Sequence, residues 1–359
     1  MGALGLGIAF ALLVLLPSLE HQVHGKQSKY ELKKCDIYQG RWVYDASYPL
    51  YDSSPCSFIE NAFACQKNGR ADELYLKYKW QPFACKLPRF DAEDFLERFR
   101  DKRIMFVGDS LSLNQWQSFT CMLHAASSES EYNFERIGST STFTFQSHNV
   151  SLMLQRNAFL VDIAHNKYGR VLKLNSIDHK DGLAWKEFDV LIFNTWHWWL
   201  HTGRKQPWEF IQDGNTLHQD MDRFVAYEKA LRTWARWVDK NVDPTKTKVF
   251  FQSISPTHWN ASFWGNPEGR NCTAETRPLA EPPYPRSPHP AQVIVEKVLR
   301  GMSKPVNLLN VTALSRLRKD GHPSIYGNEG HRGMDCSHWC LPGVPDTWNQ
   351  LLYTELIRN

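Results

Sequence analysis

The sequence has no internal repeat, no low-complexity tract and no long run of charge of one sign. Its 42 Lys and Arg residues and 38 Asp and Glu residues are scattered, so the formal net charge is only +4. These absences exclude a fibrous or disordered chain and leave nucleic-acid binding without support. After Pro17 no segment is apolar enough to span a bilayer, and no nucleotide or coenzyme A motif is present, so no bound cofactor is expected. The 359 residues are enough for one large globular domain, with or without a small lobe.

Residues 1–25 have the pattern of a secretory leader. An uncharged apolar stretch runs from Gly2 to Pro17, and Gly25 is a small residue suited to cleavage after it. The stretch is short for a membrane span, and no Lys or Arg precedes it to hold a cytoplasmic end. A cleaved signal peptide is therefore favoured over a signal anchor, and both predict entry into the secretory pathway.

The cysteines form an even set, which suits disulfide pairing in an oxidising compartment. A zinc site made by Cys336 and Cys340 beside His331 and His338 is the competing interpretation. It is disfavoured because no second close pair of cysteines exists, so no metal is expected. The eight residues are Cys35, Cys56, Cys65, Cys85, Cys121, Cys272, Cys336 and Cys340.

Four Asn-x-Ser/Thr sequons agree with passage through the secretory pathway. A single sequon is weak evidence, but the leader, the even cysteine count and the sequons point the same way. Glycosylated surface loops are therefore expected at Asn149, Asn260, Asn271 and Asn310.

After the leader, composition divides the chain into two parts. Residues 35–90 are rich in Cys, Pro, Tyr and Trp and have few periodic segments, as expected for a disulfide-stapled lobe that wraps the main domain. Residues 91–359 alternate short apolar runs with amphipathic stretches, which predicts a three-layer α/β domain with a mostly parallel sheet. The expected strands are 103–107, 189–193, 248–251 and 306–309, with a hairpin over 142–154, and the expected helices include one after Asp91, 221–238 and 291–299.

Gly108-Asp109-Ser110 follows the expected strand 103–107 and precedes an expected helix that begins at Ser112. A serine on such a strand-to-helix turn lies beside unpaired backbone N–H groups that point at developing negative charge, which supplies part of an oxyanion hole. The alternative is that Asp109 or Ser110 acts only as a helix N-cap, the commoner use of these residues. The turn alone leaves both interpretations open.

Asp335-Cys336-Ser337-His338 supplies the groups that a serine nucleophile needs. A serine hydroxyl requires an imidazole to take its proton and a carboxylate to fix the imidazole tautomer. Three residues of separation let Asp335 reach one nitrogen of His338 while the other nitrogen points at Ser110. We therefore expect a triad of these three residues, and acyl transfer at an ester, which requires two distant stretches of the chain to meet.

The chain has fourteen tryptophans, and Trp196, Trp198 and Trp199 closely follow the expected strand that ends near Asn194. Aromatic faces stack on the apolar faces of sugar rings. Because strand ends in such sheets border the functional crevice, the cluster favours a carbohydrate groove, with core packing as the alternative. The proline-rich stretch 278–290 is expected as a surface loop near its mouth.

Several motifs, in this order, resemble the plant trichome birefringence-like family: Trp80-Gln81-Pro82 with Cys85, Leu87-Pro88-Arg89-Phe90, Gly108-Asp109-Ser110, and the stretch from Asp335 to Pro342. The resemblance covers residue 35 to the C-terminus. It implies a GDSL/SGNH-like esterase fold and O-acetylation of cell-wall polysaccharides, with xylan, mannan, xyloglucan and pectin as family substrates. It also implies that Ser110 is the acetylated nucleophile, His338 the base and Asp335 its orienting partner.

The resemblance implies a disulfide framework in which Cys35 pairs with Cys85 and Cys56 with Cys121, while the other four cysteines pair among themselves. Where SGNH hydrolases in general carry Gly-x-Asn-Asp, this chain has the run from Phe193 to His197. Oxyanion or substrate contacts are expected from this run and from the nucleophile turn, at Gly108, Asp109, Asn194, His197 and Trp198.

Three functions are compared on these residues. The preferred one transfers acetyl from a donor of unknown identity, acetyl-CoA or another carrier, through acetyl-Ser110 to a hydroxyl of a polysaccharide. Hydrolysis uses the same residues with water as the acceptor. The third is a non-catalytic wall protein that binds pectin or another polysaccharide through basic and aromatic surface. The expected location is the Golgi lumen if the leader is kept as a membrane anchor, or the cell wall if it is cleaved.

Overall fold

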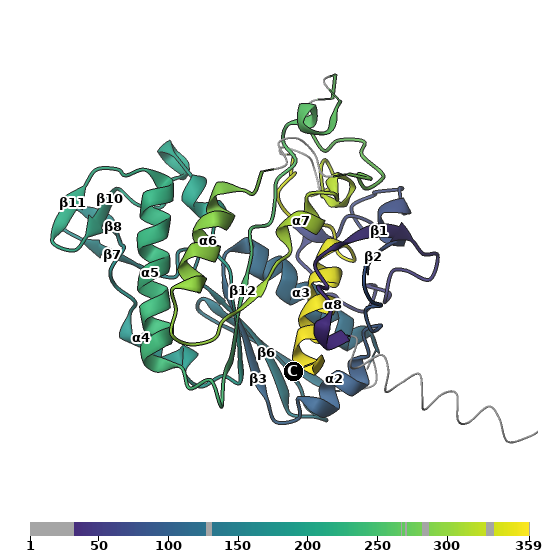
Figure 1. The fold of residues 1–359 in the computed structure, drawn as a ribbon, viewed down its shortest axis with the longest axis horizontal. Coiled ribbons are helices and arrows are strands. Elements are labelled where there is room, and N and C mark those ends of the chain that lie inside the picture. The colour runs from purple at the N-terminus through teal and green to yellow at the C-terminus, as the bar shows by residue number, and fades with distance from the viewer. Residues whose placement is uncertain are drawn as a thin grey trace, which may run out of the picture.

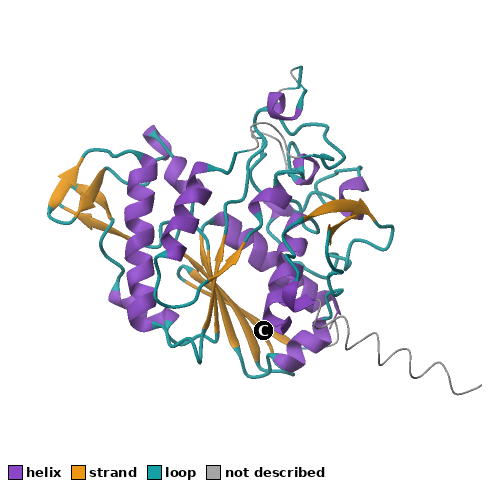
Figure 2. Cartoon of the chain, in the orientation of Figure 1, coloured by secondary structure: helices purple, strands orange, loops and turns teal. Residues whose placement is uncertain are grey.

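A seven-stranded sheet runs through the centre of the molecule, with helices on both of its faces (Figures 1 and 2). The computed structural model describes residues 32–126, 131–266, 268–269, 271–281, 287–327 and 334–358. The expected leader, His331 and part of the proline-rich stretch lie outside these residues. The expected three-layer α/β architecture is confirmed.

Five neighbouring strands of the central sheet are parallel, and two antiparallel strands extend one edge. The apolar runs expected as strands form β3, β9, β12 and β13, and β5 and β6 form the expected hairpin. Across the sheet the order is β13 (Asn307–Leu309), β12 (Lys248–Gln252), β9 (Val190–Phe193), β3 (Arg103–Gly108), β6 (Val150–Arg156), β5 (Thr140–Phe145) and β4 (Tyr132–Ile137).

The alternating side chains of β3 fill two separate cores. Ile104 and Phe106 belong to the core under α2 (Ala92–Arg98), α3 (Ser110–Ala126) and α8 (Val344–Arg358). Met105 and Val107 belong to the core on the other face, under α4 (His179–Trp185), α5 (Arg223–Asn241) and α6 (Pro290–Arg300). Successive side chains of a strand point to opposite faces, so a continuous apolar run suits a strand covered on both sides. Burying each such side chain contributes about 1.5–3 kcal/mol, which anchors β3 and the turn that follows it.

The long helices begin at capping residues. Asp91 accepts a hydrogen bond from the N–H of Asp94 at the start of α2, as expected. Asp222 accepts from two N–H groups at the start of α5, and Pro290 occupies the first turn of α6, where its missing N–H costs no hydrogen bond. The two helices expected from the spacing of apolar residues are therefore confirmed within three residues at each end.

Smaller elements surround the central layers. A second sheet contains β11 (Thr216–His218), β10 (Phe210–Asp213), β8 (Gly169–Lys173) and β7 (Asp162–Asn166), and a two-stranded ribbon pairs β1 (Gly40–Tyr44) with β2 (Tyr78–Pro82). The remaining helices are short: α7 (Thr312–Ser315), η1 (Asn61–Phe63), η2 (Leu74–Lys77), η3 (His197–Leu200), η4 (Gly203–Lys205), η5 (Ala261–Trp264) and η6 (Lys319–Gly321).

Residues 35–90 pack against α3, α7 and α8. The indole N–H of Trp42 donates to the carbonyl of Leu314 in α7 at 2.8 Å, and the Tyr38 hydroxyl donates to Glu355 in α8 at 2.9 Å. The side-chain oxygen of Gln117 in α3 accepts the N–H of Glu60 at 3.0 Å. These bonds attach the segment to α3, α7 and α8.

Four disulfides hold the chain, and both pairings implied by the family resemblance are present. Two of the four disulfides tie residues 35–90 to the main domain. Cys336 and Cys340, the cysteines of the zinc alternative, are each oxidised with a different partner, so they are not thiolate ligands. The pairs are Cys35–Cys85, Cys56–Cys121, Cys65–Cys340 and Cys272–Cys336.

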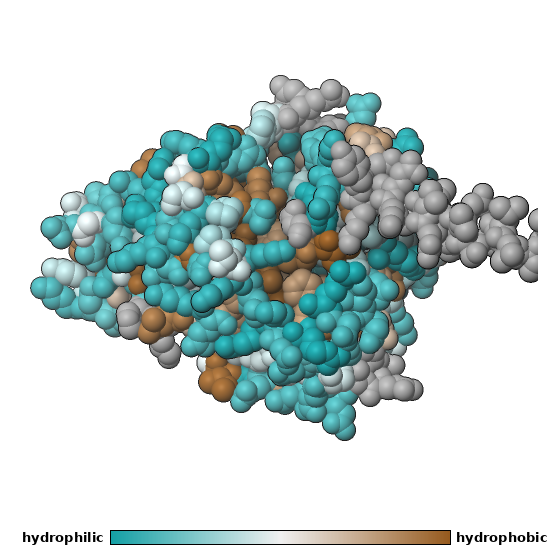
Figure 3. Space-filling view, turned by 60° about the horizontal axis from the view of Figure 1, so that its bottom comes forward, coloured by the Kyte–Doolittle hydropathy of each residue, from teal (hydrophilic) through white to brown (hydrophobic). Residues whose placement is uncertain are grey.

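The surface is mainly hydrophilic on the face shown in Figure 3, with hydrophobic residues gathered near its centre. Within the described parts of the chain, no helix combines the length and the apolar character that a membrane crossing requires.

Candidate active site

Ser110 is the first residue of α3, on the strand-to-helix turn that the sequence predicts. The neighbouring Asp109 is buried, and its carboxylate accepts the N–H of Leu111 at 2.9 Å and the N–H of Trp196 at 3.3 Å. Asp109 is therefore the residue that caps the helix, and the Ser110 hydroxyl is left for another partner. The Asp109 carboxylate accepts both of these hydrogen bonds, so an oxyanion contact by Asp109 would have to come from its backbone N–H and stays a prediction.

Gly108 lets β3 and β9 approach each other at the turn. A Cβ at this position would stand 2.2 Å from the carbonyl oxygen of Asn194 and 2.3 Å from the hydroxyl of Ser112. Neither neighbour is a flexible chain end, so a larger residue would displace the turn that carries Ser110.

Two short hydrogen bonds join Ser110, His338 and Asp335. The Ser110 hydroxyl lies 2.7 Å from Nε2 of His338, and Nδ1 of His338 lies 2.7 Å from Oδ2 of Asp335. The other oxygen of Asp335 accepts the N–H groups of Ser337 and His338 at 2.9 and 3.0 Å, which fixes the carboxylate. The structure thus brings together the three residues expected to form a triad, although 228 positions separate the serine from the histidine.

The charge of Asp335 sets the protonation of the pair. Burial opposes a proton on His338, but the hydrogen bond and the negative charge of Asp335 outweigh it and raise the pKa of the imidazole. Burial likewise opposes charge on Asp335, but hydrogen bonds from His338 and Ser337 hold its pKa well below the usual value. A stronger base beside an ionised carboxylate is the combination that activates a hydroxyl.

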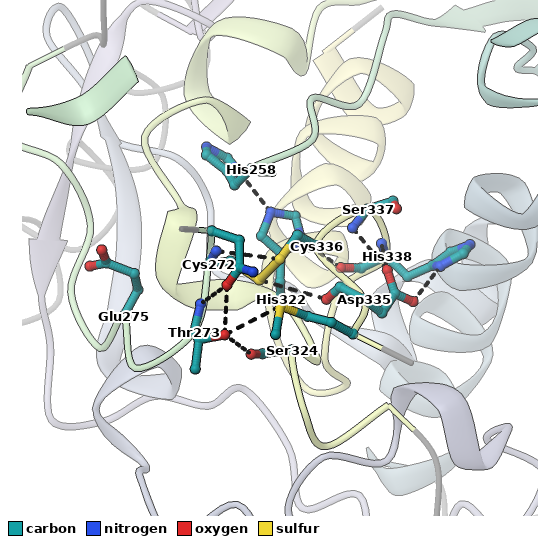
Figure 4. The surroundings of a disulfide bond; sticks show 12 residues. His258, Cys272, Thr273, Glu275, His322, Ser324, Asp335, Cys336, Ser337 and His338 are labelled. Atoms are coloured by element: carbon teal, nitrogen blue, oxygen red, sulfur yellow. Dashed lines mark hydrogen bonds and ion pairs between the residues drawn. A yellow bond between two sulfur atoms is a disulfide. The ribbon is translucent and has the colours of Figure 1, made fainter. Parts of the chain in front are cut away.

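The loop of His338 is fixed on several sides (Figure 4). Cys336 is bonded to Cys272, and its carbonyl accepts the N–H of His258 at 2.9 Å. Asp335 and Ser324 exchange two backbone hydrogen bonds, and Cys340 is bonded to Cys65 in the N-terminal segment. These links hold the base on elements that are distant in sequence, which limits its motion relative to Ser110.

Sequence reasoning missed Asn114, which joins the two halves of the site directly. Its side chain accepts the N–H of Trp339 at 2.8 Å and donates to the carbonyl of Trp339 at 3.0 Å. Asn114 lies four residues after Ser110, so both project from the same side of α3. This spacing is a signal that could have identified it.

A second missed feature is a pair of buried histidines behind the base. Nδ1 of His322 lies 2.6 Å from the carbonyl oxygen of His338, and its other nitrogen lies 2.6 Å from Nδ1 of His258 (Figure 4). Burial lowers the pKa of His258 to about 4 and that of His322 well below the usual value. The His322 ring stacks on Trp339 at a centroid distance of 4.1 Å. No sequence motif distinguishes these histidines from others.

Two hollows border the carboxyl edge of the sheet, and η3 contributes to both. The smaller hollow has a volume of about 320 Å³, and its wall includes His197, Ser255, His258, Trp264, His289 and Arg316. The larger hollow has a volume of about 720 Å³, and its wall includes Asn157, Phe159, Asp162, Asp178, Asp181 and Trp198. The N–H of Asn157 donates to the carbonyl of Gly108 at 3.0 Å, so the larger hollow begins beside the nucleophile turn.

The other expected contact residues lie around these hollows. Asn194 is buried against Gly108, and its side-chain oxygen has no hydrogen-bond partner among the described residues. Nε2 of His197 lies 2.8 Å from the carbonyl oxygen of Ser255, and burial lowers the pKa of the His197 imidazole. Trp198 is half-buried in the larger hollow.

The sugar-binding interpretation of the tryptophan cluster is wrong for two of its three members. Trp196 is 3% exposed and Trp199 is fully buried, so neither offers an open ring face on which a sugar could stack. Both pack against Tyr227 of α5, at centroid distances of 4.9 and 5.7 Å. The alternative of core packing holds for them, because the chain folds back under α5 as soon as β9 ends.

The four sequon asparagines differ in exposure. Asn149 and Asn260 are exposed, whereas Asn271 and Asn310 are half-buried. In the sequon of Asn310, Thr312 is buried and its hydroxyl donates to the carbonyl of Ile254 at 2.7 Å. Asn149 and Asn260 therefore fit the expectation of surface loops better than the other two.

Family models cover nearly all of the described chain. The model PC-Esterase, described as the GDSL/SGNH-like acyl-esterase family found in Pmr5 and Cas1p, matches residues 87–355, and the PMR5 N terminal domain matches residues 33–86. Protein trichome birefringence-like 43 of Arabidopsis thaliana is 55% identical over 353 residues, which are 97% of this chain and 95% of that protein. Protein trichome birefringence of the same plant is 39% identical over 348 residues, 91% of this chain but 57% of that protein.

The fold and the arrangement at Ser110 define the protein as a GDSL/SGNH-like acyl-esterase domain stapled by disulfides. Such a domain makes or breaks acyl esters, and the disulfides agree with a secretory route. The chain belongs to the plant trichome birefringence-like family, as its motifs indicated.

Proposed function

We propose that the protein is an O-acetyltransferase that moves acetyl through acetyl-Ser110 to hydroxyls of a cell-wall polysaccharide. The observation that carries the proposal is the chain of hydrogen bonds from Ser110 through His338 to Asp335, each 2.7 Å long, in a member of an acyl-esterase family. The same geometry argues against a wall protein that only binds polysaccharide, because binding alone needs no aligned base.

The first half of the reaction loads the enzyme. The Ser110 oxygen attacks the acetyl carbonyl as Nε2 of His338 takes the hydroxyl proton, and the bond from the carbonyl carbon to the carrier breaks as that proton passes to the leaving group. The N–H of Ser110, in the first turn of α3, is suited to donate to the transient oxyanion, because intrahelical hydrogen bonds do not use the first N–H groups of a helix. Asn194 is the side-chain candidate for a second donor.

The second half of the reaction unloads the enzyme. A sugar hydroxyl gives its proton to Nε2 of His338 and attacks the acetyl carbon. The bond from that carbon to the Ser110 oxygen then breaks, and the proton passes from His338 to this oxygen, which restores the Ser110 hydroxyl. The larger hollow supports this role, because its carboxylates can accept hydrogen bonds from sugar hydroxyls and Trp198 offers an aromatic face. Asp181 is held there by the side-chain N–H groups of Gln155 and Asn157 at 2.8 and 3.2 Å.

Hydrolysis is the second candidate, favoured by the esterase description of the matching family. It uses the same residues, and only the acceptor differs, water in place of a sugar hydroxyl. Which reaction dominates depends on how completely the polymer excludes water from acetyl-Ser110. We place the protein in the Golgi lumen or, after secretion, in the cell wall.

The direction of acetyl movement tests the proposal. The purified chain is incubated with p-nitrophenyl acetate or acetyl-CoA and with oligomers of xylan, mannan or pectin, and the acetyl content of each oligomer is followed by mass spectrometry. We expect acetyl gain on one class of oligomer. Loss of acetyl from acetylated oligomers, with no gain on any of them, would make the protein an esterase.

Replacing Asp335 with asparagine should change both the rate and its pH dependence. The base must be neutral to take a proton, so activity falls as pH drops through the pKa of His338, which Asp335 raises. In Asp335→Asn this fall should move to lower pH, and kcat/KM at its plateau should drop by about 10⁴ because the imidazole tautomer is no longer fixed. The measurement is a pH profile of kcat/KM for p-nitrophenyl acetate.

Asp243→Asn is the matched control, because Asp243 lies before β12, at the opposite edge of the sheet from Ser110. Its profile should overlay that of the unmodified protein. A profile of Asp335→Asn with an unmoved acid limb would remove Asp335 from its assigned role.

A further inference from the structure

The two hollows at the carboxyl edge of the sheet differ in charge. Among the described residues that line the smaller hollow, none is a carboxylate, and Arg316 is its only permanently charged side chain. The larger hollow is lined by three carboxylates against two cations, namely Asp162, Asp178 and Asp181 against Arg156 and Lys173. An enzyme with two substrates needs two binding sites for the parts of the substrates that do not react. In this protein the residues that line the two hollows carry opposite net charge.

The wall of the smaller hollow is bonded directly to both halves of the catalytic site. Trp196 donates its N–H to Asp109, which precedes the nucleophile. Ser255 accepts the indole N–H of Trp339, which follows the base, at 2.9 Å. The backbone N–H of His258 donates to the carbonyl of Cys336 at 2.9 Å. A molecule in this hollow therefore lies next to the residues that flank Ser110 and His338.

The polar groups of the smaller hollow suit an anion. The Arg316 guanidinium is half-buried, and one of its N–H groups donates to the carbonyl of Ser287 at 3.1 Å. Burial lowers the pKa of the lining histidines, so they contribute neutral imidazoles. Glu275, which accepts the indole N–H of the lining residue Trp264, is paired with Lys319, which compensates its charge. A partly desolvated guanidinium with no lining carboxylate attracts a phosphate more strongly than it would in water.

The size and apolar character of the smaller hollow fit a small molecule. Its volume of about 320 Å³ is at the low end of ligand pockets, and Ile254, Phe263 and Trp264 provide apolar surface. A polysaccharide chain suits the larger and more polar hollow, whose carboxylates would repel a phosphate.

We propose that the smaller hollow binds the acetyl donor, and that the donor is carried on a phosphate-bearing group recognised by Arg316. This inference rests on the proposed transfer through acetyl-Ser110. The reacting atoms of donor and acceptor pass through the same place beside Nε2 of His338, while the carrier extends into the smaller hollow and the polysaccharide into the larger one. The carrier leaves with the proton that Ser110 gave to His338, and no further reactant is required.

The test follows acetylation of Ser110 in single turnover by intact-protein mass spectrometry. Three donors are compared: acetyl phosphate, acetyl-CoA, and p-nitrophenyl acetate, which has no charge. Arg316→Ala should slow acetylation by the phosphate-bearing donors about 10- to 100-fold, the loss expected for one charge-assisted contact, and leave the uncharged donor unchanged. Arg316→Lys should recover part of the loss because it keeps the charge. A response to only one phosphate-bearing donor identifies which carrier fits.

Two further variants complete the experiment. The Arg300 side chain on α6 is 69% exposed. The control variant Arg300→Ala should therefore acetylate Ser110 as fast as the unmodified protein does. Trp198→Ala should raise KM for the oligosaccharide acceptor.

Equal slowing of all three donors by Arg316→Ala, or an effect on the acceptor step alone, would overturn the donor assignment while leaving acetyl-Ser110 in place. No acetyl-Ser110 from any donor would instead overturn the proposed function, and the donor assignment with it.

Discussion

Replacing Ser110 with alanine should abolish acetyl transfer, with a loss of kcat of about 10⁴- to 10⁶-fold. The reason is that the hydroxyl 2.7 Å from His338 is the only atom of the site that becomes covalently attached to acetyl in the proposed mechanism. Ser110→Ala should also remove the mass increase of one acetyl group that the unmodified protein shows after incubation with p-nitrophenyl acetate. Both quantities are measured on the same preparation, by product formation and by intact-protein mass.

Ser303→Ala is the matched serine control, because Ser303 is exposed and lies beyond the end of α6. It should retain full activity and full acetyl loading. Folding of Ser110→Ala is checked by its unfolding midpoint, which should stay close to that of the unmodified protein. Full transfer by Ser110→Ala would remove the nucleophile assignment and with it the acetyl-enzyme mechanism.

Removing the Cys65–Cys340 disulfide should give the largest loss of stability. This bond closes a loop of 275 residues, for which the chain-entropy argument gives a contribution of about 5.5 kcal/mol to the free energy of unfolding. We expect the double variant Cys65→Ala with Cys340→Ala to unfold at a much lower urea concentration. Its kcat should also fall, because Cys340 lies two residues after His338 and holds that loop on the N-terminal segment.

The Cys35–Cys85 disulfide is the internal comparison. It closes a loop of only 50 residues, so the same argument gives about 4 kcal/mol. The corresponding double variant should therefore lose about 1.5 kcal/mol less and keep its kcat, because neither cysteine is near the catalytic loop. Equal losses of stability and activity in the two variants would contradict this account of the Cys65–Cys340 bond.

The central strands and the residues that we propose as catalytic could be predicted from the sequence because each has a local signal. The run from Ile104 to Val107 is apolar without interruption, as a strand covered on both faces must be. Asp335 and His338 lie within one loop, so their contact needs only three residues of spacing. The meeting of His338 with Ser110 could be proposed from chemistry, but only the fold brings them together.

Other parts could not be predicted because their signals are absent or misleading. α8 is buried around its whole circumference between α3 and the N-terminal segment, so its sequence lacks an amphipathic period. The strands β7, β8, β10 and β11 contain three to five residues each, too few for a clear alternation. Trp196 and Trp199 were wrongly expected to contact a sugar, because the sequence does not distinguish a tryptophan after a strand end that faces a ligand from one that faces the core.

The wide separation of Cys65 from Cys340 has a consequence for the making of the protein. During synthesis the nucleophile emerges long before its base, and Cys65 must wait for a partner that appears 275 residues later. Cys56–Cys121 can attach residues 35–90 to α3 earlier, but their bond to the loop of His338 has to wait for Cys340, and until then Ser110 has no imidazole beside it. In the proposed mechanism the growing chain therefore cannot take up acetyl until translation has passed His338.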